Sequence, residues 1–156
     1  MRKDDISKEF SSLAFDFFYW FSRFEFCLKE NGYLKHSAHG TKAEPGWNKF
    51  VKTYEGIYLP SAEGKELLAK PPECQIVLAN GSLGWRPVEI ADCTSDLARV
   101  TRLVKTVRNN LFHGGKHGAA DWDNPVRAES LLSVSKVILG QFAVLGQFES
   151  DYERLY

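Results

Sequence analysis

The chain of 156 residues is 44% hydrophobic and 13% aromatic, which is enough to fill a core and excludes a disordered chain. Its 20 basic and 20 acidic side chains cancel. This balance excludes the global basic field of a non-specific nucleic-acid binder, so any contact with RNA has to be local. We therefore expect one globular domain over residues 1–156.

The cysteines indicate a reducing compartment. Cys27, Cys74 and Cys93 are odd in number, widely spaced and free of a Cys-x-x-Cys pair, which argues against a disulfide framework and against a zinc site. His36 and His39 do not combine with these cysteines at the spacing of metal ligands. We expect neither a metal nor a cofactor.

The N-terminal residues are charged from Arg2 onward and contain no apolar signal-peptide core. No uncharged apolar run approaches the roughly 18 residues that are needed to span a bilayer. From these features we expect a cytoplasmic protein with no membrane partner.

The first predicted element is a long helix over residues 5–30. Its apolar stripe recurs every three or four residues, as one face of a helix does, and consists of Ile6, Phe10, Leu13, Phe17, Phe21, Phe24 and Leu28. Five more aromatic residues lie off that stripe: Phe15, Phe18, Tyr19, Trp20 and Phe26. They require a second covering surface, either the middle of the chain or a second copy of the protein, and both remain open. Asn31-Gly32 ends the helix, because glycine readily adopts a left-handed turn.

The middle of the chain, residues 33–90, is predicted to be an irregular insertion packed on a helical core. Glycines and prolines are scattered through short apolar clusters. Residues 47–58 and 63–70 favour two short helices. Residues 74–78 and 83–85, joined by a turn with Asn80-Gly81, are compatible with a small hairpin, although such short runs do not distinguish strand from helix by periodicity.

Two more long helices are predicted in the last third of the chain. Asp92, Thr94 and Ser95 offer N-cap side chains, and apolar residues then repeat at alternating steps of three and four up to Leu111, which predicts a helix over residues 94–113. Gly114-Gly115 ends it, and Asn124-Pro125 begins a last helix over residues 125–149. The expected fold class is therefore all-α, with at least three long helices.

The most specific stretch of the sequence is Arg-Asn-Asn-Leu-Phe-His-Gly-Gly-Lys at residues 108–116. Arg108 and His113 stand five residues apart, about 140° around an ideal helix, so they do not share a face. They converge either if His113 lies in a frayed last turn or if two copies of the motif meet across a two-fold axis. An imidazole moves protons near neutral pH and a guanidinium holds a phosphate through two hydrogen bonds, so the pair suffices for RNA cleavage without a metal.

This stretch resembles the signature of the HEPN superfamily of all-helical domains, in the form found in prokaryotic defence and toxin systems. The resemblance extends to residues 20–29, because such domains often carry charged residues on their first long helix near the motif; Arg23 and Glu25 are the charged residues here. It covers about the outer two thirds of the chain, and residues 33–87 match no known pattern.

The resemblance implies a HEPN-like helical bundle that acts as a metal-independent endoribonuclease at a homodimer interface. Arg108 and His113 would be the catalytic pair, and Asn109 occupies the polar position that follows the arginine in many active members. Lys116 is a possible additional cation. The implied partners are RNA, a second copy of the chain, and an antitoxin or a defence-system protein.

Three of these residues have plainer interpretations. Arg23 and Glu25 could orient the motif, but charged helix residues are more often solvated surface groups. Lys105 belongs to a basic edge with Arg99, Arg102 and Arg108 that could follow a phosphate backbone, or that could simply be a solvated face.

Two other functions compete with ribonuclease activity. In the first, a non-catalytic helical module binds RNA, a nucleotide or a protein through the same cleft, and His113 is dispensable for chemistry. In the second, the protein is an interaction subunit whose aromatic first helix docks a partner, while the motif only caps its helix and braces the dimer.

Overall fold

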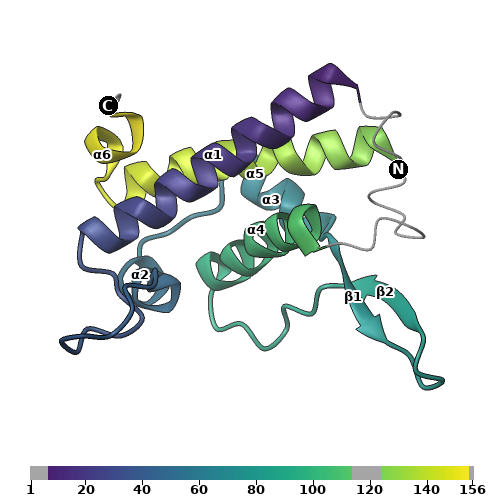
Figure 1. Cartoon of the computed structure of the whole chain (residues 1–156), viewed down its shortest axis with the longest axis horizontal. Helices are drawn as coiled ribbons and strands as arrows, with labels where there is room; N and C mark the ends of the chain where they lie inside the picture. Colours follow the sequence, from purple (N-terminus) through teal and green to yellow (C-terminus); the bar gives the residue numbers. More distant parts are fainter. Residues whose placement is uncertain (1–6, 114–123, 155–156) are drawn as a thin grey trace.

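The computed structural model describes residues 7–113 and 124–154, without the side chain of His113. The described part of the chain is mostly helical with one small hairpin (Figure 1). In chain order its elements are α1 (Lys8–Glu30), α2 (Trp47–Tyr54), α3 (Ala62–Ala69), β1 (Glu73–Val77), β2 (Leu83–Pro87), α4 (Asp96–His113), α5 (Pro125–Leu145) and α6 (Glu149–Glu153). The expectation of three long helices around an irregular middle is confirmed, and the hairpin makes the fold mostly rather than wholly helical.

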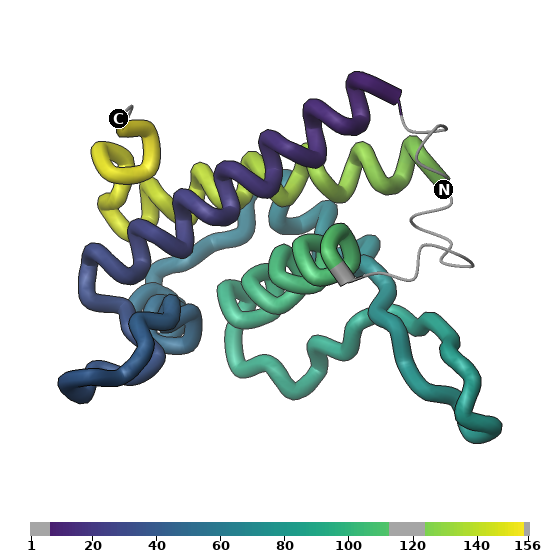
Figure 2. The backbone as a smooth tube through the Cα atoms, in the orientation of Figure 1, coloured from purple at the N-terminus to yellow at the C-terminus, as the bar shows by residue number. Residues whose placement is uncertain are grey.

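The three long helices α1, α4 and α5 form the body of the fold. In Figure 2, α1 and α5 run side by side from right to left, and α4 lies below them and runs the opposite way. The short helix α6 folds back on α1 and α5, and α3 packs between α4 and α5. The C-terminal end of α4, which carries the motif, therefore lies on the side of the molecule where α1 and α5 begin.

The ends of α1 follow from local chemistry. The Ser7 side chain accepts a hydrogen bond from the backbone N–H of Phe10 at 3.0 Å, which caps the first turn. At the other end Gly32 adopts a φ of +78°, as expected for the residue that turns the chain away from a helix. The helix begins at Lys8 instead of residue 5 and ends where predicted.

The predicted apolar stripe of α1 is buried. It contributes Phe10, Phe17, Phe21, Phe24 and Leu28 to the core, with Leu13 half-buried against it; Ile6 lies outside the described residues. Burial of this stripe is the main source of stability for α1, because helix propensity alone is weak.

The structure separates the five aromatic residues that lie off the stripe. Trp20 packs on Tyr152 of α6, with ring centroids 4.7 Å apart, and Phe26 is half-buried beneath the Arg23 guanidinium. Phe15, Phe18 and Tyr19 are exposed. The middle of the chain does not cover these three within the described residues, which leaves them as an exposed aromatic face of α1.

The middle segment contributes to the core through α2 and α3. Phe50 of α2 is fully buried and contacts the rings of Phe24, Phe142 and Phe148. These aromatic contacts join α1, α2 and α5 in one cluster. The two predicted short helices are thus confirmed: α2 ends four residues before the predicted end, and α3 begins and ends one residue earlier than predicted.

The hairpin, which the sequence left open, is present in the structure. β1 and β2 pair antiparallel from Glu73↔Pro87 to Val77↔Leu83, and Gly81 in the turn has a φ of +78°. One link to α4 is made by Asn110, which is buried and donates from its side-chain amide to the Glu73 carbonyl at 2.7 Å. Asn110, the second of the two asparagines in the motif, therefore has a structural role.

The predicted end of the last helix is wrong, because α5 ends at Leu145 and a separate short helix, α6, begins at Glu149. The Phe148 N–H bonds to the Ala143 carbonyl at 2.8 Å, and Gln147 has a φ of +59°. This is the bonding of a Schellman C-terminus, which ends the helix and directs Phe148 into the core. The apolar periodicity of the sequence extended the predicted helix through Phe148 because that residue is buried whether the helix continues or ends before it.

Helix α5 is the one described helix that is long and apolar enough, by length and composition, to cross a bilayer. It packs against α1, α3, α4 and α6. Its apolar composition is therefore accounted for by the core that these helices form.

Candidate functional site

Arg108 lies in the next-to-last turn of α4 and is held by aromatic rings. Its guanidinium carbon lies 5.7 Å from the centre of the Phe21 ring on α1 and 5.3 Å from that of Phe112, close enough for attraction by the ring faces. Its Nη1 donates to the Asn109 side-chain oxygen at 3.2 Å. Within residues 7–113 and 124–154 no carboxylate pairs with this guanidinium, so its charge is available to an anion.

The remaining motif residues are placed only in part. Asn109 is exposed and lines a pocket on α4 together with Lys105. His113 is the last residue of α4, so its backbone is placed at the C-terminal end of the same helix as Arg108. The His113 side chain and the whole of Lys116 lie outside the described residues.

Lys105 lies one turn before Arg108 and is half-buried. Its Nζ is 5.8 Å from the centre of the Trp47 ring on α2. Burial lowers the pKa of Lys105; the Glu25 carboxylate opposes this effect, whereas Arg108 and Lys35 add to it. In the described part of the chain this ammonium has no ion pair and no hydrogen bond.

The first two members of the predicted basic edge are neutralised. Arg99 pairs with Asp96 at 2.8 Å, and Arg102 binds both carboxylate oxygens of Asp92, at 2.5 and 2.9 Å. The Arg102 guanidinium lowers the pKa of Asp92 and keeps it ionised. Only the C-terminal half of the edge, Lys105 and Arg108, carries charge without an acidic partner among the described residues.

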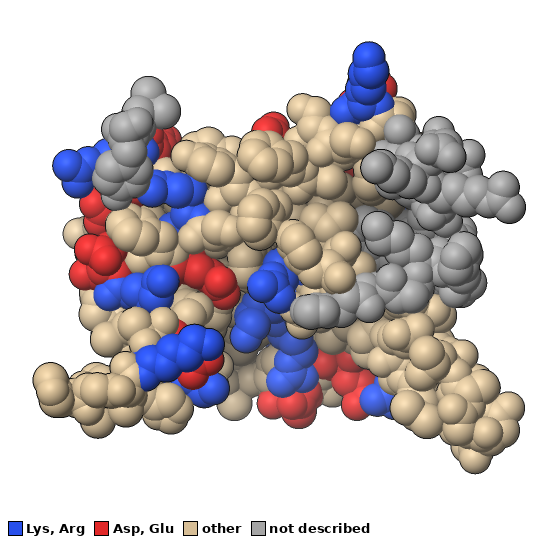
Figure 3. All heavy atoms as spheres, viewed as in Figure 1, with Lys and Arg blue, Asp and Glu red and all other residues tan. Residues whose placement is uncertain are grey.

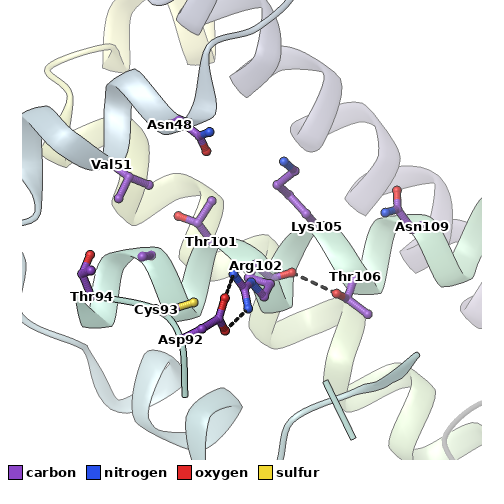
Figure 4. Close-up of a pocket in the computed structure, with 11 residues that line it drawn as sticks. Asn48, Val51, Asp92, Cys93, Thr94, Thr101, Arg102, Lys105, Thr106 and Asn109 are labelled. Carbon is purple, nitrogen blue, oxygen red and sulfur yellow. Dashed lines mark hydrogen bonds and ion pairs between the residues drawn. The ribbon is translucent and has the colours of Figure 1, made fainter. Parts of the chain in front are cut away.

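A groove lies between α2 and α4 and consists of two adjoining pockets of about 380 and 360 Å³. Both pockets are lined by Asn48 and Lys105; the first extends along α4 past Thr101 to Asn109, and the second reaches Lys35 and Lys49. Figure 4 shows the Thr101 and Lys105 side chains pointing from α4 toward the space beside Asn48. In Figure 3, Lys and Arg side chains gather at the centre of this face of the molecule, over α4.

Glu25 and Arg23 face different parts of the molecule. The Glu25 carboxylate accepts a hydrogen bond from the Trp47 indole at 2.9 Å and is close enough to Lys105 to raise its pKa, so it stands at the edge of the groove. Arg23 is only 9% exposed and donates to the carbonyls of Asp151, Tyr152 and Arg154 at the end of the chain. The interpretation of Arg23 as a solvated residue is wrong, and its described contacts are those of a brace between α1 and α6.

Sequence reasoning missed Asn48 and Thr101, which line the groove. Thr101 is 5% exposed, and its hydroxyl has no hydrogen-bond partner. A weak signal existed for Thr101, because it lies four residues before Lys105 and so shares its helix face. No sequence signal existed for Asn48, which comes from a segment more than fifty residues earlier.

Of the three cysteines, Cys93 is buried and lines the first pocket of the groove (Figure 4). Cys27 is buried, and burial raises the pKa of its thiol to about 11, which makes it a poor nucleophile. Among the described residues no group of three or more His, Cys, Asp or Glu side chains is arranged to hold a metal ion.

The chain matches no family model, and no curated protein or solved structure matches it significantly. Assignment to the HEPN superfamily therefore stays a prediction from residues 108–116, and what can be said of function rests on the site itself.

Proposed function

We propose that this protein is a metal-independent endoribonuclease of the HEPN type, with Arg108 and His113 as its catalytic pair. The observation that supports this proposal most directly is the environment of Arg108. Its guanidinium is half-buried, is positioned by the rings of Phe21 and Phe112, and is not neutralised by a carboxylate among the described residues. A positioned cation near the surface is the group needed to stabilise a pentacoordinate phosphorane.

In the proposed reaction RNA supplies its own nucleophile. An imidazole of His113 removes the 2′-OH proton, the O2′ atom attacks phosphorus, and the P–O5′ bond breaks as the leaving O5′ atom receives a proton from the protonated imidazole of a second protomer. Arg108 binds the non-bridging oxygens through this sequence, and Asn109 holds the guanidinium through its side-chain oxygen. The products carry 2′,3′-cyclic phosphate and 5′-hydroxyl ends.

The dimer in this proposal is formed by the exposed aromatic face of α1, defined as Phe15, Phe18 and Tyr19. Phe18 contacts the Phe112 ring at a centroid distance of 5.1 Å, so this face is continuous with the motif helix. An interface there would bring two motifs together and exclude water from three exposed aromatic rings.

The proposed setting is a cytoplasmic toxin or defence effector, in which activity is controlled by an antitoxin or another subunit. This part of the proposal is supported by the resemblance of residues 108–116 alone. Lys116 would add a cation beside the cleaved phosphate.

The test is cleavage of total and transfer RNA in EDTA by the wild type, Arg108→Ala and His113→Ala. We expect the wild type to cut and to leave 2′,3′-cyclic phosphates, and each variant to lose activity by at least about a hundredfold, as is usual when a general acid–base or an oxyanion-stabilising group is removed. Arg99→Ala is the matched control, because it removes an arginine from the same helix that is already paired with Asp96. It should retain activity.

If none of these proteins cuts RNA while all are folded and dimeric, the catalytic proposal fails. The second candidate, a non-catalytic module that binds RNA, a nucleotide or a protein partner, then takes its place. The observation that favours this candidate is the groove between α2 and α4, whose shared wall carries the unpaired ammonium of Lys105.

A further inference from the structure

The ammonium of Lys105 sits in a position that is unfavourable without an anion. It is half-buried between α2 and α4, and burial disfavours its charge. The nearest carboxylate, Glu25, accepts a hydrogen bond from the Trp47 indole. In the described residues Lys105 makes no hydrogen bond and no ion pair; its favourable interactions are with the Trp47 ring at 5.8 Å and with the more distant Glu25 carboxylate.

A second group in the same pocket also lacks a partner. The Thr101 hydroxyl is buried on α4, four residues before Lys105, and makes no hydrogen bond. A buried hydroxyl in that state is destabilising and is uncommon in folded proteins. Thr101 lines the groove through its side chain, and rotation about its χ1 bond would bring the covered hydroxyl to an oxygen of a bound molecule.

Neutral side chains line the same pocket as Lys105 and Thr101: Asn48 of α2 and Asn109 of α4 are exposed there. The carboxylate in the first pocket, Asp92, is bound by Arg102. In the second pocket Glu44 pairs with Lys35 at 3.7 Å, and Lys49 adds a further cation. A lysine with hydroxyl and amide donors is a common combination for phosphate oxygens. The two pockets, about 380 and 360 Å³, fall within the range of small-molecule sites.

We propose that Lys105, Thr101 and Asn48 form a binding site for a phosphate group in the groove between α2 and α4. Lys105 supplies the charge, Thr101 donates its hydroxyl hydrogen, and the Asn48 amide donates from the opposite wall. The phosphate belongs either to a free nucleotide or to a nucleic-acid strand that passes along α4. This site lies one helical turn from Arg108 and does not depend on whether the protein cleaves RNA.

The test follows the Trp47 indole N–H resonance in ¹H–¹⁵N NMR spectra of the full chain. This N–H lies beside Lys105 and is bonded to Glu25, so an anion bound at the ammonium should shift its resonance. The probes are inorganic phosphate, AMP and a short single-stranded oligodeoxynucleotide, which has no 2′-OH and is not cut. Saturable shifts with phosphate and AMP identify a nucleotide site, and shifts with the oligonucleotide alone identify a strand site.

Variants decide whether the named residues bind the phosphate. Lys105→Met keeps most of the packing of the side-chain stem and should weaken binding at least about tenfold, as the loss of a charged hydrogen bond does. Thr101→Val keeps the shape of the side chain and should weaken binding about threefold to fivefold. Lys65→Met is the control, because Lys65 is an exposed lysine on α3 outside both pockets.

The proposal is overturned if no probe shifts the Trp47 resonance, or if Lys105→Met and Thr101→Val bind as tightly as the wild type. Equal weakening by Lys65→Met would also overturn it, because the attraction would then be non-specific. Arg108→Ala should still bind phosphate in this assay, so failure of the ribonuclease proposal and failure of this one give different results.

Discussion

Two arginines of this chain illustrate how burial decides what a guanidinium does. Arg108 lies against the faces of two aromatic rings and has no acidic partner among the described residues. Arg23 uses its donors on three carbonyl oxygens at the end of the chain, where the C-terminal carbonyls of α6 would otherwise lack partners. The same type of side chain is thus half-buried without an acidic partner among the described residues in one case and makes a structural contact in the other.

We expect Arg23→Met to lower the free energy of unfolding by about 1.5–3 kcal/mol, because it removes charged hydrogen bonds to one buried and two partly buried carbonyl groups. The measurement is urea denaturation followed by circular dichroism. Arg99→Met, which breaks an exposed ion pair, should lower it by about 1 kcal/mol or less. Loss of RNA cleavage by Arg23→Met in a protein that remains fully folded would contradict the bracing role and return Arg23 to the site.

At the level of elements, the boundary between α5 and α6 is the clearest departure from the predicted fold. Gln147 has a left-handed backbone, which L residues with a Cβ rarely adopt, and a Cβ built on Gly146 would lie 2.5 Å from Cε2 of Phe148. The end of α5 thus requires a glycine at residue 146, whereas residue 147 keeps a side chain in spite of its left-handed backbone.

We expect Gln147→Gly to raise the free energy of unfolding by about 0.5–1 kcal/mol, because glycine adopts a positive φ without steric penalty. Gly146→Ala should instead lower it, since the Phe148 ring has to move out of its buried position. Thermal unfolding of both variants measures the two effects. A stabilising effect of Gly146→Ala would show that α5 can continue through residue 146, as the periodicity predicted.

At the level of the whole molecule, the exposed aromatic face of α1 is the feature that the described residues leave without a cover. Phe15 is 65% exposed in the N-terminal half of α1, whose opposite stripe packs into the core. Such a face is unusual in a monomer and is typical of an interface.

We expect the wild type to be a dimer in analytical ultracentrifugation and Phe15→Glu to shift it toward monomer, because a carboxylate would have to be buried in the interface. Phe15→Glu should then also reduce RNA cleavage without touching Arg108. Leu59→Glu is the matched control, since Leu59 is 86% exposed in the loop between α2 and α3 and should leave the dimer intact. A wild type that is monomeric at all accessible concentrations would contradict the dimeric form of the proposed reaction.

The order of helices in this protein, and most of their ends, could be predicted from the sequence. Apolar spacing and caps act within a few residues of each other, as Ser7 does on Phe10 and Asn124 on Arg127, so a linear pattern records them. The motif at residues 108–116 was visible for the same reason, and its Arg108 proved to be accessible in the fold.

Only the tertiary structure decided which side chains meet across the chain. It placed Arg23 against carbonyls more than 120 residues away, Asn48 opposite Lys105, and Phe15 in solvent instead of under the middle segment. These outcomes depend on how helices pack, and packing energies are shared among many residues that are distant in sequence, so no local pattern records them. The motif at residues 108–116 is therefore a property of the sequence, and the groove between α2 and α4 beside it is a property of the fold.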